Sequence, residues 1–298
     1  MRAQRGFILV NALVLVGALA AAAAVLLIRA EMSVQRQAAW QGAAQIDAYL
    51  DAFEALAITV LEADPAGGPD TATEGWAQPI VAADLDRGAV TGTIEDLQGR
   101  FNVNWLAVPD DLGAQEGFAR LLAGLGMPPE LGAQIAGFLT PGGPLNVDAY
   151  SGMDPATRPR GGPLLDTRQL LGMPGMSRAQ FDRLEPLIAA LPSDTRLNVN
   201  TALPEVLAVW LPGVTVEQAQ RLVARRTRAP FSSVQDFLLE LSPAVAAELD
   251  DTRISIGSEW FLARASARLD GRVASRRVVL SRHPLPVGVL VDYRLPDD

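Results

Sequence analysis

The sequence contains no cysteine and no lysine, and its only histidine is His283. Without cysteine, the chain forms no disulfide and offers no thiolate to a metal ion or a substrate. His283 stands directly before Pro284, a pattern typical of a loop, and no serine or aspartate lies in a recognisable nucleophile motif. The sequence therefore predicts a protein that is not an enzyme.

Positive charge is also scarce. The chain has 25 basic residues, all of them arginine, against 34 acidic residues, and its formal net charge is −9. Removing Arg2 and Arg5 with a short N-terminal leader would change this to −11, since −9 − 2 = −11. Such a balance disfavours nucleic acid and acidic lipid surfaces as partners. The 298 residues, of which 49% are hydrophobic, suffice for two folded units beyond a membrane anchor.

One long apolar run lies close to the N-terminus. Residues 7–28 carry no charge, and Asn11 is the only clearly polar residue among them. A bilayer core needs roughly 20 apolar helical residues, whereas the apolar core of a secretory signal has roughly 7–15. Arg2 and Arg5 favour a cytoplasmic position for the short leader. The sequence predicts one membrane-spanning helix, with the rest of the chain across the membrane.

The beginning of this run resembles a type IV prepilin signal. In that family a basic leader ends in glycine, and a dedicated prepilin peptidase cleaves before an apolar residue whose new amine is then methylated. The resemblance implies a leader at 1–6 and cleavage between Gly6 and Phe7. The family usually has glutamate at the fifth mature position, where this chain has Asn11. An ordinary signal anchor is the alternative.

Apolar residues continue at helical spacing beyond the apolar run, from Ile46 to Leu61, and Pro65 follows. We expect either one helix over 7–62, with its second half packed on a globular domain, or an anchor separated from a shorter helix by a break near residues 30–40. Alternation of apolar and polar residues predicts five strands, at 89–94, 99–104, 259–269, 272–281 and 287–295. Residues 96–99 would be the turn between the first two strands, and Asp270-Gly271 is a strong hairpin turn. The expected sheet is antiparallel, with the long helix on its apolar face.

Residues 106–252 have no strand alternation and predict an inserted helical domain with an internal repeat. Residues 171–177 and 210–215 each contain Pro-Gly, then an apolar residue, then Ser or Thr, an arrangement that predicts two helices joined by a tight turn. A weaker copy lies at 125–129. The fold class is therefore α+β. The predicted division is 1–6 leader, 7–62 N-terminal helix, 63–105 first part of the β domain, 106–252 helical insertion and 253–298 second part of the β domain.

The second repeat resembles a helix-hairpin-helix module. Many such modules bind DNA, because backbone N–H groups at a helix start can bind phosphate. Four arginines add local positive charge: Arg221, Arg225, Arg226 and Arg228. The alternative function is accordingly a membrane-anchored helix-hairpin-helix DNA-binding protein of a periplasmic uptake system. The acidic balance and the anchor favour a scaffold, in which replacement of Arg225 and Arg226 is expected to leave secretion largely intact.

Two asparagine-rich segments carry a more specific resemblance. Asp96-Leu97-Gln98-Gly99-Arg100-Phe101-Asn102-Val103-Asn104 and Leu197-Asn198-Val199-Asn200-Thr201-Ala202 are similar to two signatures of the minor pseudopilin K family of the type II secretion system (general secretion pathway protein K). The resemblance implies a pseudopilin fold and a structural subunit at the tip of the periplasmic pseudopilus. It also implies a single-pass inner-membrane anchor with the C-terminal domain in the periplasm, and minor pseudopilins I and J as partners.

Calcium is the one cofactor to consider. Asp148, Asp154 and Asp166 could supply oxygen ligands, but no alternating Asp/Asn loop is present. Members of the K family commonly carry an acidic segment in the insertion, linked to calcium in some of them, and the corresponding residues here, 137–140, contain no carboxylate. The sequence therefore predicts that calcium stabilises the chain weakly or not at all.

Overall fold

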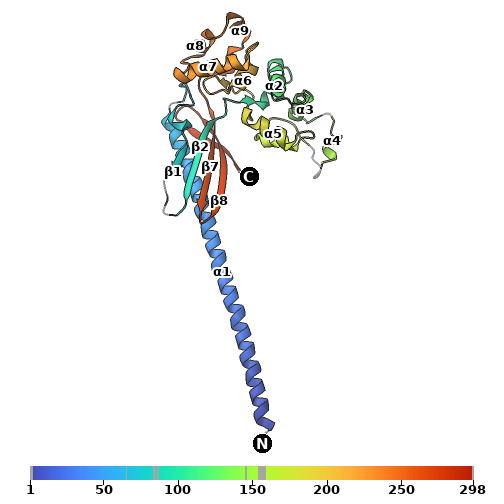
Figure 1. Cartoon of the computed structure of the whole chain (residues 1–298), viewed down its shortest axis with the longest axis vertical. Coiled ribbons are helices and arrows are strands. Elements are labelled where there is room, and N and C mark those ends of the chain that lie inside the picture. The colour runs from blue at the N-terminus through green and yellow to red at the C-terminus, as the bar shows by residue number, and fades with distance from the viewer. Residues whose placement is uncertain are drawn as a thin grey trace.

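The computed structural model describes residues 3–64, 66–82, 85, 87–144, 146–153 and 159–296. Its longest element is helix α1 (Ala3–Ala63), which runs for 61 residues, or about 90 Å at 1.5 Å per residue. The helix is continuous, so the alternative of a break near residues 30–40 is excluded. Figure 1 shows its N-terminal half projecting alone from the rest of the molecule.

The two halves of α1 have different surroundings. The large apolar side chains from Leu13 to Ile28 are each at least 51% exposed. Beyond them, a row of apolar side chains at helical spacing is buried against the sheet, and it consists of Ile46, Leu50, Phe53, Ala57 and Leu61. One helix therefore combines an apolar segment without contacts and a segment that belongs to a protein core.

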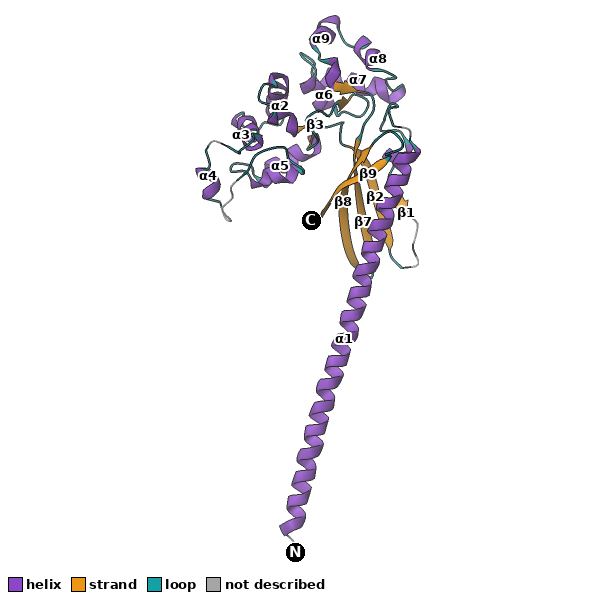
Figure 2. Ribbon diagram, turned by 180° about the vertical axis from the view of Figure 1, so that it is seen from behind, coloured by secondary structure: helices purple, strands orange, loops and turns teal. Residues whose placement is uncertain are grey.

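The sheet has five antiparallel strands in the order β1-β2-β7-β8-β9. Their bounds are β1 (Ile80–Ala82), β2 (Ala89–Asp96), β7 (Trp260–Leu269), β8 (Arg272–Arg282) and β9 (Val289–Pro296). α1 lies across one face (Figure 2). Gly92 of β2 permits this close packing, because a Cβ atom there would lie 2.3 Å from the ring of Phe53. Asp270 and Gly271 have positive φ angles and form the predicted hairpin turn between β7 and β8.

One predicted strand is wrong. Residues 99–104 do not enter the five-stranded sheet, and 96–99 do not form a hairpin turn within it. Instead, β3 (Phe101–Asn102) pairs in parallel with β4 (Ile188–Ala189), and a 3₁₀ helix follows at Val103–Ala107. The outer position beside β2 is taken by β1, for which no strand was predicted from the sequence. The side chains of Asn102 and Asn104 explain the difference, because they bind backbone groups of the insertion.

The helical insertion lies at the C-terminal end of α1, away from the N-terminus; part of it extends beyond that end of the helix, and part lies beside the sheet (Figures 1 and 2). Its α-helices are α2 (Leu112–Gly124), α3 (Glu130–Leu139), α4 (Asp148–Ser151), α5 (Arg178–Leu184), α6 (Pro204–Trp210), α7 (Val216–Arg228), α8 (Val234–Leu239) and α9 (Pro243–Glu248). The insertion also contains 3₁₀ helices at Thr167–Gly172, Glu185–Leu187 and Asp251–Arg253, and one more lies before β1, at Gly75–Ala77. A second parallel pair joins β5 (Leu197–Asn198) to β6 (Ile254–Ser255). A large apolar core holds the insertion together, and its buried rings include Trp105, Phe118, Phe181, Phe231 and Phe237.

Both predicted repeats have the expected turn. Gly175 and Gly213 adopt positive φ angles of 86° and 68°, which favour glycine. Ser177 caps α5 in a reciprocal capping box with Gln180, and Thr215 does the same for α7. The helix before the first turn is the 3₁₀ helix Thr167–Gly172, whereas α6 precedes the second.

Candidate functional site

The N-terminal site residues of the sequence analysis lie in α1. The backbone of Gly6, Phe7 and Asn11 is helical, but their side chains are outside the part of the chain that the structure describes. The described residues from Ala12 onward form a helix that is long and apolar enough to cross a membrane, with a mean hydropathy of 2.4 in a window that is 0% buried. Length, composition and exposure thus agree with the predicted anchor, and cleavage between Gly6 and Phe7 stays a prediction.

The first asparagine motif joins the start of the insertion to its later segments. Asn102 Oδ1 accepts hydrogen bonds from the backbone N–H groups of Asn104 and Leu191, at 3.1 and 3.0 Å. Its Nδ2 donates to Pro192 O at 2.8 Å. Asn104 accepts from Leu164 N at 2.7 Å and donates to Leu164 O at 2.9 Å and Leu191 O at 2.8 Å. Both asparagines are 1% exposed, so they replace water as partners of buried backbone groups.

The second motif repeats this arrangement. Asn198 Oδ1 accepts from Asn200 N at 2.9 Å, and its Nδ2 donates to Ser258 Oγ at 2.8 Å. Asn200 accepts from Phe231 N at 2.9 Å and donates to Phe231 O and Ile256 O at 3.0 and 3.2 Å. Each Asn-Val-Asn segment therefore closes one of two similarly built halves of the insertion. The first asparagine of each segment is the last residue of a short strand, β3 or β5, which pairs in parallel with a strand later in the chain.

Asp96 connects the sheet to the second motif. Its Oδ1 accepts from Gln98 N at 2.7 Å, and its Oδ2 accepts from the Ser258 hydroxyl at 2.6 Å, the Asn198 amide at 3.1 Å and the Thr201 hydroxyl. Burial raises the pKa of Asp96 above its ordinary value, and these hydrogen bonds, with that from Ser258 the strongest, act in the opposite direction. Sequence reasoning placed Asp96 in a turn. In the structure, its carboxylate instead connects β2 to the insertion through the hydrogen bonds from Asn198 and Thr201.

Two of the four arginines considered for DNA binding are structural. Arg226 donates to Val199 O and Ala202 O, both at 2.6 Å, and so binds the backbone of the second asparagine-rich segment itself. Burial lowers the pKa of Arg226 to about 10, partly opposed by the charge of Asp96. The guanidinium of Arg226 thus points into the protein. Replacement of Arg226 leaves two backbone carbonyls without this partner, so a destabilised insertion is expected in addition to any effect on secretion, for which the sequence-based expectation stays a prediction.

Arg225 also belongs to the internal packing of the insertion. Its Nε lies 2.9 Å from Glu240, its Nη2 lies 3.5 Å from Asp236, and its guanidinium lies 4.9 Å from the ring centre of Phe231. Arg221 and Arg228 are exposed. The positive charge of α7 is therefore divided between structural contacts and solvent, a pattern that favours the scaffold interpretation of the helix-hairpin-helix unit over phosphate binding.

The three acidic residues considered for calcium have different environments. Asp148 is exposed in the first turn of α4, and Asp154 lies outside the described residues. Asp166 caps the 3₁₀ helix Thr167–Gly172, and its Oδ2 accepts a hydrogen bond at 2.7 Å from Arg277 of the sheet. Asp166 therefore has a role in joining the insertion to the sheet. His283 shares a hydrogen bond of 3.1 Å with the Ser281 hydroxyl.

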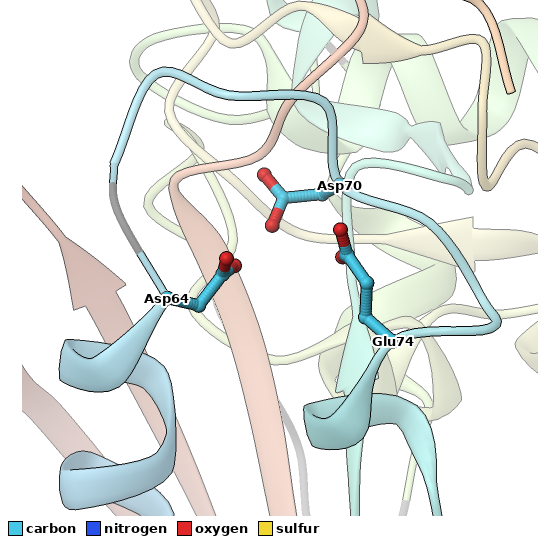
Figure 3. Close-up of side chains that lie close together, drawn as sticks. All are labelled: Asp64, Asp70 and Glu74. Carbon is cyan, nitrogen blue, oxygen red and sulfur yellow. The ribbon is translucent and has the colours of Figure 1, made fainter.

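A group of carboxylates that sequence reasoning missed lies at the C-terminal end of α1 (Figure 3). Asp64, Asp70 and Glu74 each have a carboxylate oxygen within 4.8 Å of such an oxygen on the other two. Arg282 of β8 donates to Asp64 at 2.6 Å and also to Asp70. Burial raises the pKa of Asp70 to about 6, although hydrogen bonds from Arg282 and Ser258 lower it. The sequence feature that could have indicated this group is three acidic residues within a short stretch rich in Gly and Pro. The same feature is typical of a solvated loop, so it did not distinguish the two.

These observations together define a class of protein: a long apolar N-terminal helix, consistent with a membrane anchor, packs its second half on a small antiparallel sheet, as in pilins, and a helical insertion is added. The chain belongs to the type II secretion system protein K family. Residues 99–193 and 197–256 each match a family described as type II secretion system (T2SS), protein K. The resemblance inferred from the two asparagine-rich segments is thereby confirmed.

Relatives and a solved structure agree with this assignment. The type II secretion system protein K of Pseudomonas aeruginosa is 31% identical, over 94% of this chain and 88% of the relative. That of Klebsiella pneumoniae is 28% identical, over 96% and 95%. A crystal structure of the GspK-GspI-GspJ complex from enterotoxigenic Escherichia coli contains a chain with the same fold, at a TM-score of 0.72 and 20% identity, covering 88% of this chain and 99% of that one.

Proposed function

We propose that the chain is a non-enzymatic minor pseudopilin that occupies the tip of the periplasmic pseudopilus and binds minor pseudopilins I and J. The observation that carries the proposal is the position of α7, α8 and α9 of the insertion, which lie beyond the end of α1 (Figure 1). In a fibre built from parallel N-terminal helices, a further subunit placed above this one would meet the insertion. A subunit of this shape therefore fits the end of a fibre and not its repeating shaft.

The partners follow from the structural relative. That relative was crystallised as a GspK-GspI-GspJ complex, and its fold covers most of this chain. The assembly surface is proposed to include the exposed half of α1, because isolated apolar helices associate through side-chain packing in a membrane. The anchor is proposed to cross the inner membrane once, with the sheet and insertion in the periplasm. Cleavage between Gly6 and Phe7 by prepilin peptidase would give the mature N-terminus.

Co-purification tests the proposal. The full chain, tagged at its C-terminus and extracted in detergent, is expected to recover the I and J pseudopilins of the same cell, with one copy of the chain per pseudopilus. The shaft pseudopilin under the same tag is the control and should recover mainly itself. Recovery of many copies of this chain along one fibre would contradict the tip position. Intact-mass measurement of the same preparation tests cleavage, since retention of residues 1–6 would contradict it.

A further inference from the structure

The cluster of Asp64, Asp70 and Glu74 lies where α1 ends and the chain turns toward the sheet. Asp64 directly follows α1, and Glu74 precedes the 3₁₀ helix Gly75–Ala77. Figure 3 shows the three carboxylates converging from both sides of this turn. Asp70 is 1% exposed, whereas Asp64 and Glu74 are half-buried, so solvent reaches the cluster at Asp64 and Glu74.

The cluster has more negative charge than the protein neutralises in it. Arg282 is the cation in contact with Asp64 and Asp70, through Oδ2 of each. Three carboxylates and one guanidinium leave a formal charge of −2, since −3 + 1 = −2. Asp70 Oδ2 also accepts from Ser258 N at 2.6 Å, but the buried Asp70 Oδ1 accepts no hydrogen bond from any described residue. A buried carboxylate oxygen without a partner is costly, so this atom requires an explanation.

Glu74 is held in position by its neighbours. Its Oε2 accepts hydrogen bonds from Thr71 N at 2.9 Å and from the indole N–H of Trp76 at 2.8 Å. Trp76 is itself 3% exposed and packs against Phe261 of the sheet. Hydrogen bonds from neighbouring groups, such as these two, hold a carboxylate in the orientation in which it can bind an ion. The orientation of Glu74 is therefore not that of a freely solvated side chain.

We propose that Asp64, Asp70 and Glu74 bind a divalent cation of the calcium type. Calcium binds oxygen ligands at about 2.3–2.6 Å, so two ligands of one ion lie no more than about 5 Å apart, and the separation of 4.8 Å meets this limit. The ion supplies a partner for the buried Asp70 carboxylate and balances the charge of −2. Three carboxylate ligands leave coordination positions for water, which the half-buried side of the cluster admits.

Such an ion fastens the end of α1 to the segment that leads to β1, and Arg282 links this segment to the sheet. Asp64 belongs to the helix end, and Arg282, which shares two of the carboxylates, belongs to β8. The site differs from the acidic residues of the insertion, Asp148 and Asp166, and it replaces the expectation that calcium has little effect on this chain. The proposal does not depend on the partners or on the tip position.

A thermal melt of the full chain in detergent tests the proposal. After treatment with EGTA and dialysis, CaCl₂ should raise Tm by about 5–10 °C at a hundredfold excess over Kd. Glu74→Gln should lose most of this rise, because glutamine still accepts the hydrogen bonds of Thr71 and Trp76 but carries no charge. Asp64→Asn is the second variant. Asp148→Asn, which alters an exposed acid of the insertion, is the matched control and should keep the full rise.

Terbium luminescence tests the location of the cation site independently of the thermal melt. Tb³⁺ commonly replaces Ca²⁺ and emits when a nearby tryptophan is excited, and Trp76 donates a hydrogen bond to Glu74. Sensitised emission, displaced by CaCl₂, is expected for the wild type and for Asp148→Asn but not for Glu74→Gln. The proposal is overturned if CaCl₂ raises Tm no more than NaCl of equal ionic strength. It is also overturned if Glu74→Gln and Asp64→Asn keep the rise, or if Asp148→Asn removes it.

Discussion

Asn104 binds both backbone groups of Leu164: its Oδ1 accepts from Leu164 N at 2.7 Å, and its Nδ2 donates to Leu164 O at 2.9 Å. A side-chain amide thus pairs with a buried peptide group much as a neighbouring strand would. Asn200 forms the same pair of bonds with Phe231, at 2.9 and 3.0 Å. The two asparagines of the family signatures therefore act as fixed backbone partners inside the insertion, and their importance is in folding.

Replacement of Asn104 by alanine should destabilise the protein strongly. It leaves Leu164 N, Leu164 O and Leu191 O without this partner. An unpaired buried group costs about 1–3 kcal/mol, and the lower end of this range for three groups gives an expected loss of about 3 kcal/mol. Chemical denaturation of the full chain in detergent measures it. Asn146→Ala is the control, because Asn146 is exposed and accepts only from Asp148 N at 3.1 Å among its described contacts. Equal losses in the two variants would contradict this role of Asn104.

Replacement of two different arginines on α7 by alanine should affect the free energy of unfolding to different extents. Arg226→Ala removes the donor to Val199 O and Ala202 O and is expected to cost about 2–3 kcal/mol. Arg221→Ala alters an exposed side chain and should change stability by no more than about 0.5 kcal/mol. Denaturation curves measure both values. Binding to duplex DNA at low salt provides the functional comparison: if the wild type bound DNA and Arg221→Ala did not, the scaffold interpretation of α7 would be wrong.

Tyr293 should make stability depend on alkaline pH. Burial, with the charges of Asp166 and Asp292, raises the pKa of its hydroxyl to about 12, while Arg277 lowers it. A raised folded-state pKa favours the protonated form, so the contribution of Tyr293 is complete below about pH 10 and is lost as pH rises toward 12. Denaturation between these values, compared with Tyr293→Phe, measures it. The phenylalanine variant should lose less stability over this interval, and an identical loss in both proteins would contradict the assignment.

The features that the sequence predicted well are encoded locally. The course of α1 follows from an apolar run and then a helical row of apolar residues, and both lie within one segment of chain. The β7–β8 hairpin likewise follows from two alternating segments and Asp270-Gly271 between them. The two Pro-Gly turns of the insertion carry their own capping residues. In each case the residues that decide the structure are close together in sequence.

The wrong strand at 99–104 shows what local patterns cannot separate. Phe101, Asn102, Val103 and Asn104 alternate apolar and polar side chains, as in a strand with one face in water, yet all four are at most 1% exposed. The polar positions are buried because asparagine amides bind backbone groups that lie far away in sequence. The same holds for Arg226, Asp96 and the cluster around Asp70, whose partners come from remote segments and could not be identified without the fold.

Asn11 stands at the position of the apolar N-terminal segment where pilin-like subunits usually have a glutamate, the fifth mature position. An ionised carboxylate at the centre of a bilayer costs about 2.5–3.5 kcal/mol on insertion scales unless it is paired. A subunit that docks beneath others can pair this charge with the N-terminal amine of a neighbour. A subunit at the tip has no neighbour above it to supply that amine. Asparagine keeps hydrogen-bonding groups without the charge, which suits the tip.

Asn11→Glu is therefore expected to leave secretion unchanged or to reduce it, because the new carboxylate has no amine partner at the tip. Asn11→Ala should be mild, since it removes a polar group without adding a charge to the bilayer. Secretion assays and crosslinking to the partner pseudopilins measure both variants, and immunoblots of the membrane fraction control for insertion. A glutamate variant that assembled along the shaft and improved secretion would show that residue 11 does not distinguish a tip subunit, and Asn11 would then be a tolerated polar residue of an ordinary anchor.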